Sequence, residues 1–106
     1  MPTFVAAGFD RKPADQSLRD RYRTEHREFL HQNPGRIICG GAMLDEHRLQ
    51  CGSLYILAAE TIEDVHSWLA QDPFVANGIY ETLAVREVDD SGPWWALRSG
   101  QSHSSA

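Results

Sequence analysis

Three separate segments of this chain carry side chains that could move a proton: His26, Ser53 directly after Gly52, and Asp72 directly before Pro73. A histidine changes charge near neutral pH, a carboxylate can orient its ring, and a hydroxyl can donate to a substrate oxygen. Held together in apolar surroundings, these groups would be sufficient for acid–base chemistry on a small organic molecule. The sequence therefore predicts such a site, provided that the fold brings the three segments together.

His26 is expected on the inward face of a helix that runs from about residue 15 to residue 32. It follows Tyr22 by one helical turn, so the two side chains share a face. Arg23 and Arg19 lie on the same stripe, one and two turns earlier, and would place cationic groups at one end of a cavity. Such a cavity would suit an anionic substrate.

Each of these residues also has a purely structural interpretation. His26 could be a core histidine bonded to a backbone carbonyl, with the arginines solvating the helix edge. Asp72 before Pro73 is typical of a helix N-cap, and Ser53 could be a hydroxyl at the end of a strand. For Asp72 the two roles are compatible, because a carboxylate held by backbone amides stays ionised and could still orient His26.

Hydrophobic patterns predict the elements that must position these residues. Apolar runs indicate four strands, and apolar residues at helical spacing indicate two helices and one short helical turn. The strands are expected at 3–9, 36–44, 49–58 and 79–88, the helices at 15–32 and 61–71, and the turn at 73–77. The resulting order, βαββαβ, is typical of a ferredoxin-like α+β fold: a four-stranded antiparallel sheet with its helices on one face.

The second face of this sheet would have no helix over it. Residues 4–9, 37–39 and 54–58 are apolar at consecutive positions, so both faces of these strands are expected to lie away from water. A homodimer in which two sheets pack face to face would achieve this. Trp94 and Trp95 could extend the last strand or cover the dimer contact.

Length and composition restrict the class of protein. The 106 residues are enough for one domain, expected at 1–97, with a polar tail at 98–106 that is expected to be disordered. No apolar run approaches the ~18 residues of a membrane span. Residues 1–9 lack the features of a secretory signal, so we expect a cytoplasmic protein without a membrane partner. The net charge of −5 does not suit a nucleic-acid partner.

Neither a metal nor a cofactor is predicted. The histidines other than His26 show no spacing typical of metal ligands, and the chain has no glycine-rich phosphate loop and no Gly-x-Ser-x-Gly motif. Cys39 and Cys51 lie on neighbouring predicted strands. In a cytoplasmic protein they would stay reduced, and we interpret both as small core residues.

The polar residues belong to longer motifs that follow one another along the chain. These motifs are Arg19-x-x-x-Arg23-x-x-His26-x-x-Phe29-Leu30, Gly40-Gly41-Ala42-Met43-Leu44, Gly52-Ser53-Leu54, and Asp72-Pro73-Phe74 followed by Gly78. In this order they resemble the YciI-like (YCII-related) family over about residues 3–90. The resemblance implies a dimeric α+β barrel with a histidine and an aspartate facing one another in the active site, here His26 and Asp72. The chain departs from the family at Gly40-Gly41, where many relatives have Gly-Pro.

The resemblance also implies a class of reaction. One related protein is a dehydrochlorinase that acts on a chlorinated, hydroxylated aromatic, and the wider barrel superfamily includes isomerases and cofactor-free oxygenases. Together with the residues, this favours a cofactor-independent lyase or isomerase in which His26 and Asp72 transfer a proton on a small anionic or phenolic molecule. Arg19, Arg23 and Ser53 would bind that molecule. Two alternatives stay open: a non-catalytic small-molecule-binding dimer, and polar residues that only stabilise the fold.

Overall fold

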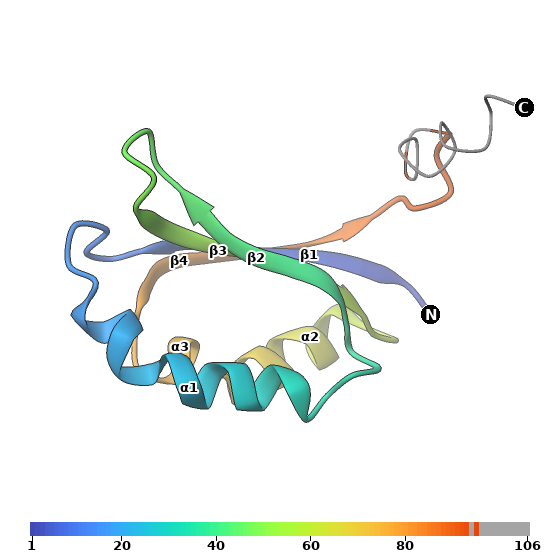
Figure 1. Cartoon of the computed structure of the whole chain (residues 1–106). Coiled ribbons are helices and arrows are strands. Elements are labelled where there is room, and N and C mark those ends of the chain that lie inside the picture. Colours follow the sequence, from blue (N-terminus) through green and yellow to red (C-terminus); the bar gives the residue numbers. More distant parts are fainter. Residues whose placement is uncertain (94, 96–106) are drawn as a thin grey trace, which may run out of the picture.

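The computed structural model describes residues 1–93 and 95. Its strands are β1 (Thr3–Asp10), β2 (Ile37–Leu44), β3 (Gln50–Ala58) and β4 (Tyr80–Val88), and its helices are α1 (Ser17–His31), α2 (Ile62–Leu69) and α3 (Pro73–Ala76). The strands form one four-stranded antiparallel sheet in the order β2-β3-β1-β4. All three helices lie on the same side of this sheet (Figure 1). The ferredoxin-like α+β fold predicted from the sequence is confirmed.

Local sequence signals explain where the two later helices begin and end. The Thr61 side chain accepts a hydrogen bond from the Asp64 amide and caps α2. Asp72 caps α3 in the same way, with Pro73 in the first helical turn. Gly78 follows α3 with a φ of 67°, a left-handed conformation that glycine adopts readily and that ends the helical segment.

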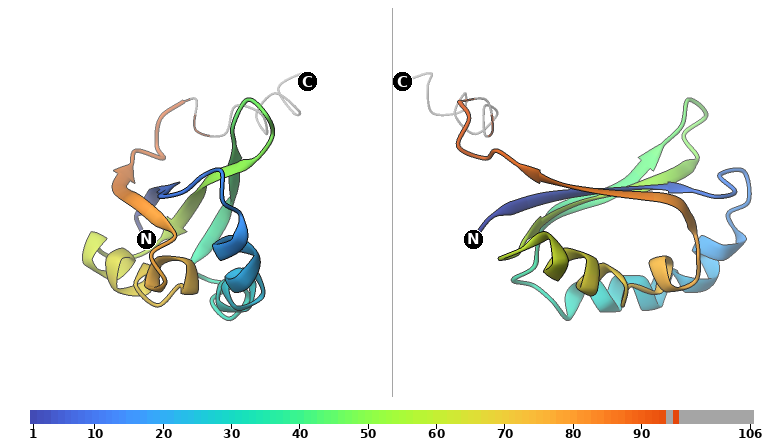
Figure 2. Two further views of the ribbon diagram at one scale, coloured as in Figure 1. Left: turned by 90° about the vertical axis from the view of Figure 1, so that its left-hand side faces the viewer. Right: turned by 180° about the vertical axis from the view of Figure 1, so that it is seen from behind.

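The sheet and the helices form two layers (Figure 2), and the buried hydrophobic side chains lie between them. On β1 the side chains alternate, so that Phe4 and Ala6 are buried beneath the helices while Phe9 points to the other side. Val65 and Leu69 of α2 are fully buried against the same core. The apolar face of α1 is only partly buried, because it also forms the roof of a cavity.

The opposite face of the sheet carries apolar side chains without a covering layer in the single chain. Phe9 and Leu54 are 51% and 37% exposed. They come from β1 and β3, which pair directly, and Ala7 lies opposite Leu54 in the ladder, so the exposed side chains form a continuous apolar surface. We call this the open face.

The structure corrects the prediction for Cys39, and it bears only in part on the predictions for the two tryptophans and the C-terminal tail. Cys39 is exposed and Cys51 is half-buried, both as free thiols, so the interpretation of Cys39 as a core residue is wrong. Cys39 lies opposite Ile56 in the ladder, on the side of β2 that faces away from the helices. β4 ends at Val88 and does not continue to Trp95. The predictions for Trp94 and for residues 98–106 lie outside the described residues.

In the described part of the chain, no helix has both the length and the apolar character needed to cross a membrane.

Candidate active site

His26 and Asp72, distant in the sequence, are in direct contact. His26 Nδ1 lies 2.7 Å from Asp72 Oδ1, and the two side chains are 13% and 0% exposed. The same carboxylate oxygen accepts the Phe74 amide at 2.9 Å, which is the N-cap contact of α3. Asp72 therefore combines the capping role with a direct hydrogen bond to the histidine ring.

The contact with Asp72 determines which nitrogen of His26 is left for a ligand. An ionised carboxylate can only accept hydrogen bonds, so Nδ1 carries the ring proton. Nε2 then presents a lone pair, and it has no hydrogen-bond partner in the described residues. The ring is fixed by stacking on Phe74, with centroids 3.9 Å apart and planes 1° from parallel. The Tyr55 ring meets it edge-on, with centroids 6.3 Å apart, so His26 is oriented by one polar and two aromatic contacts.

A pair of buried tyrosines supports Asp72 from the sheet side. The Tyr55 hydroxyl donates to Asp72 Oδ2 at 2.7 Å and lies 2.7 Å from the Tyr80 hydroxyl. Burial raises the pKa of Tyr80 to about 12 and also raises the pKa of Tyr55. Both hydroxyls are therefore protonated at neutral pH and available as donors. Our sequence analysis did not identify either tyrosine, although Tyr55 follows Ser53 by two positions and so shares its face of β3.

Arg19, expected to bind a substrate anion, is held by a carboxylate from β1. Its Nε and Nη2 atoms lie 2.6 and 2.8 Å from the two oxygens of Asp10, and both residues are buried. Arg19 Nη2 also donates to Ser53 Oγ at 3.0 Å. The Asp10 partner was not foreseen, and it largely balances the charge of Arg19.

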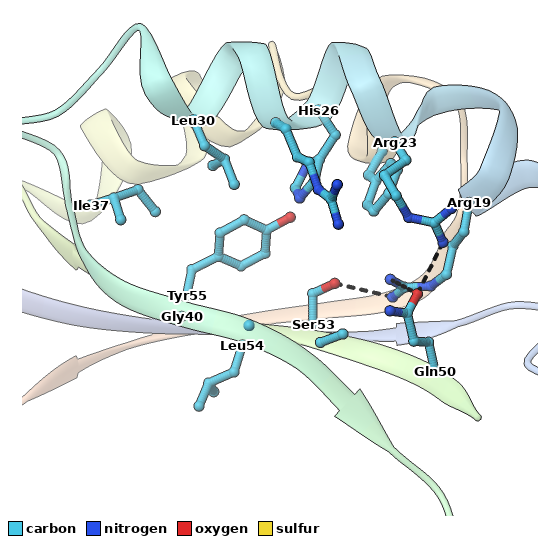
Figure 3. Close-up of a pocket in the computed structure, with 14 residues that line it drawn as sticks. Arg19, Arg23, His26, Leu30, Ile37, Gly40, Gln50, Ser53, Leu54 and Tyr55 are labelled. Carbon is cyan, nitrogen blue, oxygen red and sulfur yellow. Dashed lines mark hydrogen bonds between the residues drawn. The ribbon is translucent and has the colours of Figure 1, made fainter. Parts of the chain in front are cut away.

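Four of these residues, Arg19, His26, Ser53 and Tyr55, line one cavity of about 310 Å³ between α1 and the strands β2 and β3 (Figure 3). One end is polar: Arg23 donates to Gln50 at 3.3 Å and pairs with the exposed Asp20 at 2.6 Å, and Arg27 lines the cavity one turn further along α1. The other walls are apolar or lack side chains, and they include Leu30, Ile37, Gly40, Gly41, Ala42 and Phe74. Leu54 borders the cavity from β3, but its side chain points away from it (Figure 3). Within the described residues, no three His, Cys, Asp or Glu side chains gather as a metal-binding group.

The fold and the site together define a ferredoxin-like α+β domain whose cavity, under its first helix, contains an oriented histidine. The family model described as the YCII-related domain matches residues 3–89, and this chain belongs to that family. The family predicted from the sequence motifs is thereby confirmed.

Solved structures support the fold. The chain is similar to 5-chloro-2-hydroxyhydroquinone dehydrochlorinase (TftG) from Burkholderia phenoliruptrix AC1100, in complex with 2,5-dihydroxybenzoquinone, with 26% identity and a TM-score of 0.73 over 82% of this chain and 93% of that one. An antibiotic biosynthesis monooxygenase shows 18% identity and a TM-score of 0.53, covering 84% and 97% of the two chains. A NIPSNAP family protein from Agrobacterium tumefaciens C58 shows 14% identity and a TM-score of 0.51, covering 86% of this chain and 95% of that one. The last two likenesses concern the fold alone. A comparison with curated proteins finds no significant match.

Proposed function

We propose that this protein is a cofactor-independent enzyme, a lyase or isomerase, in which His26 Nε2 accepts and returns a proton of a small phenolic or anionic substrate. The observation that carries the proposal is the His26-Asp72 contact of 2.7 Å beside a cavity of about 310 Å³. Asp72 keeps the proton on Nδ1 and stabilises the imidazolium that forms when Nε2 takes up a second one. The ring is thereby prepared to act first as a base and then as an acid.

In an elimination, the steps would run as follows. Nε2 first moves the proton of one substrate hydroxyl to the ring carbon that bears the leaving group, so the oxygen becomes a carbonyl and that carbon becomes saturated. Nε2 then removes the proton of a second hydroxyl, whose O–H electron pair forms another carbonyl. The displaced ring electrons expel the leaving group, such as chloride, from the saturated carbon. The imidazolium of His26 then releases the proton to water, so that the net product is the unsaturated ring and the acid of the leaving group. Isomerisation would use the same base and return the proton to a different atom.

The substrate class is supported by the cavity and by one relative. A volume of about 310 Å³ is at the small end of ligand sites, so a single substituted ring is a suitable occupant. The similar dehydrochlorinase acts on a chlorinated, hydroxylated ring. Arg23 and Arg27 at the polar end would attract an oxyanion of such a ring. Arg19, already paired with Asp10, and Ser53 would contribute mainly hydrogen-bond geometry.

We further propose that a second copy of the chain covers the open face. Phe9 and Leu54 lie there on the paired strands β1 and β3, and an apolar surface of this kind is stabilised by removal from water. Face-to-face packing of two sheets would bury it without involving the helix side, where the cavity lies.

The direct test is turnover by His26→Gln. The wild type is screened against hydroxylated and halogenated aromatics, with halide release and mass spectrometry as readouts. The glutamine amide can still donate to Asp72 but is not a base, so we expect kcat/KM to fall by about 10²–10⁴-fold. His66→Gln, at an exposed position of α2, is the matched control and should retain the wild-type rate.

A rate close to the wild type in His26→Gln would refute the catalytic role. A wild type that binds such rings in a thermal-shift assay but converts none of them would instead support a non-catalytic binding module.

A further inference from the structure

Two buried tyrosine hydroxyls beneath the cavity form a hydrogen-bonded chain that ends on Asp72, and the carboxylate determines the direction of each bond. A carboxylate can only accept, and Asp72 Oδ2 accepts from Tyr55 at 2.7 Å. The Arg19 guanidinium nearby can only donate, and it donates to Ser53 Oγ at 3.0 Å. The tyrosine hydroxyls must therefore donate towards Asp72.

The order can be followed atom by atom. Tyr55 has a single hydroxyl proton, and it is used for Asp72, so in the 2.7 Å contact between the tyrosines Tyr80 must be the donor. The two hydroxyls thus form a series that runs from Tyr80 to Tyr55 to Asp72.

The backbone is shaped to place Tyr80 in this chain. The β1–β4 ladder is regular up to the pair Phe9 and Thr82, and it then shifts so that Asp10 lies opposite Tyr80. In a regular ladder Glu81 would occupy that position and Tyr80 would point to the other side of the sheet. A Cβ on Gly8 would lie 2.8 Å from the Tyr80 ring, so a glycine is needed where this ring passes under β1.

We propose that Tyr55 and Tyr80 are positioning residues for the His26-Asp72 pair, acting in series. Tyr55 engages the second oxygen of Asp72, so the carboxylate plane is held with its first oxygen towards His26. Tyr80 strengthens that donation, because a hydroxyl that accepts a hydrogen bond becomes a better donor. The consequence for catalysis rests on the proposed function above, whereas the series itself is measurable without a substrate.

A neutral donor on Asp72 disperses the negative charge that His26 faces. Removing the donor concentrates this charge and should favour the protonated ring. The other charged groups around the ring are Arg23 and Arg27 on its own helix and Arg19 above Phe74. They are unchanged by a tyrosine-to-phenylalanine substitution, so the effect can be assigned to the hydroxyl.

The experiment is a double-mutant cycle read by NMR on the His26 ring. Tyr55→Phe should move the midpoint of the ring titration upward, since Asp72 loses one of its three donors. Tyr80→Phe should move it in the same direction by less. In the Tyr55→Phe background, Tyr80→Phe should cause no further shift of the midpoint, because Tyr80 acts on Asp72 only through the Tyr55 hydroxyl. Tyr22→Phe on α1 is the control and should leave the midpoint in place.

Additive shifts, or no shift in either single variant, would overturn the series. If Tyr55→Phe does not fold, the low-field Nδ1 proton resonance of His26 in Tyr80→Phe decides instead, and an unchanged resonance refutes the proposal. Failure of the proposed function would look different: the titration would respond as expected while the wild type converts no substrate. Where turnover is found, Tyr55→Phe should lower kcat with little change in KM, as expected for a residue that acts through Asp72.

Discussion

Alkaline pH should destabilise this protein through the buried Tyr80, and the size of the effect follows from the structure. Burial raises the pKa of Tyr80 from 10.0 to about 12, and the ring is 7% exposed. The unfolded chain ionises near the ordinary value, so above it the unfolded state loses its proton first and is favoured. The contribution of Tyr80 to stability is therefore fully present below about pH 10 and is lost as the pH rises through about 12.

The magnitude is set by the difference between the two pKa values. Each pKa unit corresponds to about 1.4 kcal/mol, so a rise from 10.0 to about 12 corresponds to about 3 kcal/mol of unfolding free energy. This is a substantial part of the ~5–15 kcal/mol that is typical for a domain. The pKa of Tyr55 is shifted in the same direction, which should make the alkaline transition of the wild type steeper still.

The assay is urea denaturation at a series of pH values between about 8 and about 11.5, with tyrosinate formation followed by ultraviolet absorbance. Tyr80→Phe carries no ionisable group at this position, so its unfolding free energy should fall less steeply with pH than that of the wild type. Tyr22→Phe, on the partly buried face of α1, is the control and should follow the wild-type slope. Equal slopes for Tyr80→Phe and wild type would refute the inference that the Tyr80 hydroxyl is held in a dry, buried position.

Two further variants test other parts of the structure. Asp10→Asn leaves the Arg19 charge buried without its partner and should lower the unfolding free energy by about 3–5 kcal/mol in urea, while adding Arg19→Met should recover most of it. A loss below about 1 kcal/mol would show that the pair is solvated. Leu54→Asp places a charge on the open face and should convert a dimeric wild type to a monomer by analytical ultracentrifugation. A wild type that sediments as a monomer would contradict the proposed pairing.

The order of elements and the position of two site residues could be predicted from the sequence because they depend on local signals. Helical spacing placed His26 on the inward face of α1, and the side chain is 13% exposed there. The Asp72-Pro73 pair predicted a helix start, and Asp72 does cap α3. Runs of apolar residues located all four strands to within a residue or two. Each of these inferences needs only neighbours in the chain.

The partners of these residues were decided by the tertiary structure. In the sequence, Tyr55 is indistinguishable from its neighbours in an apolar strand, and only the tertiary fold brings its hydroxyl to Asp72. In the sequence, Asp10 is simply the polar residue that ends an apolar strand. Only the fold brings it to Arg19, and its carboxylate then balances the charge of the guanidinium. Tyr80 faces the site because the β1–β4 register shifts by one residue at Asp10. Side chains alternate between the two faces of a strand, so a single irregular pairing decides which residue reaches the core, and pairing across a sheet depends on segments that are far apart in the sequence.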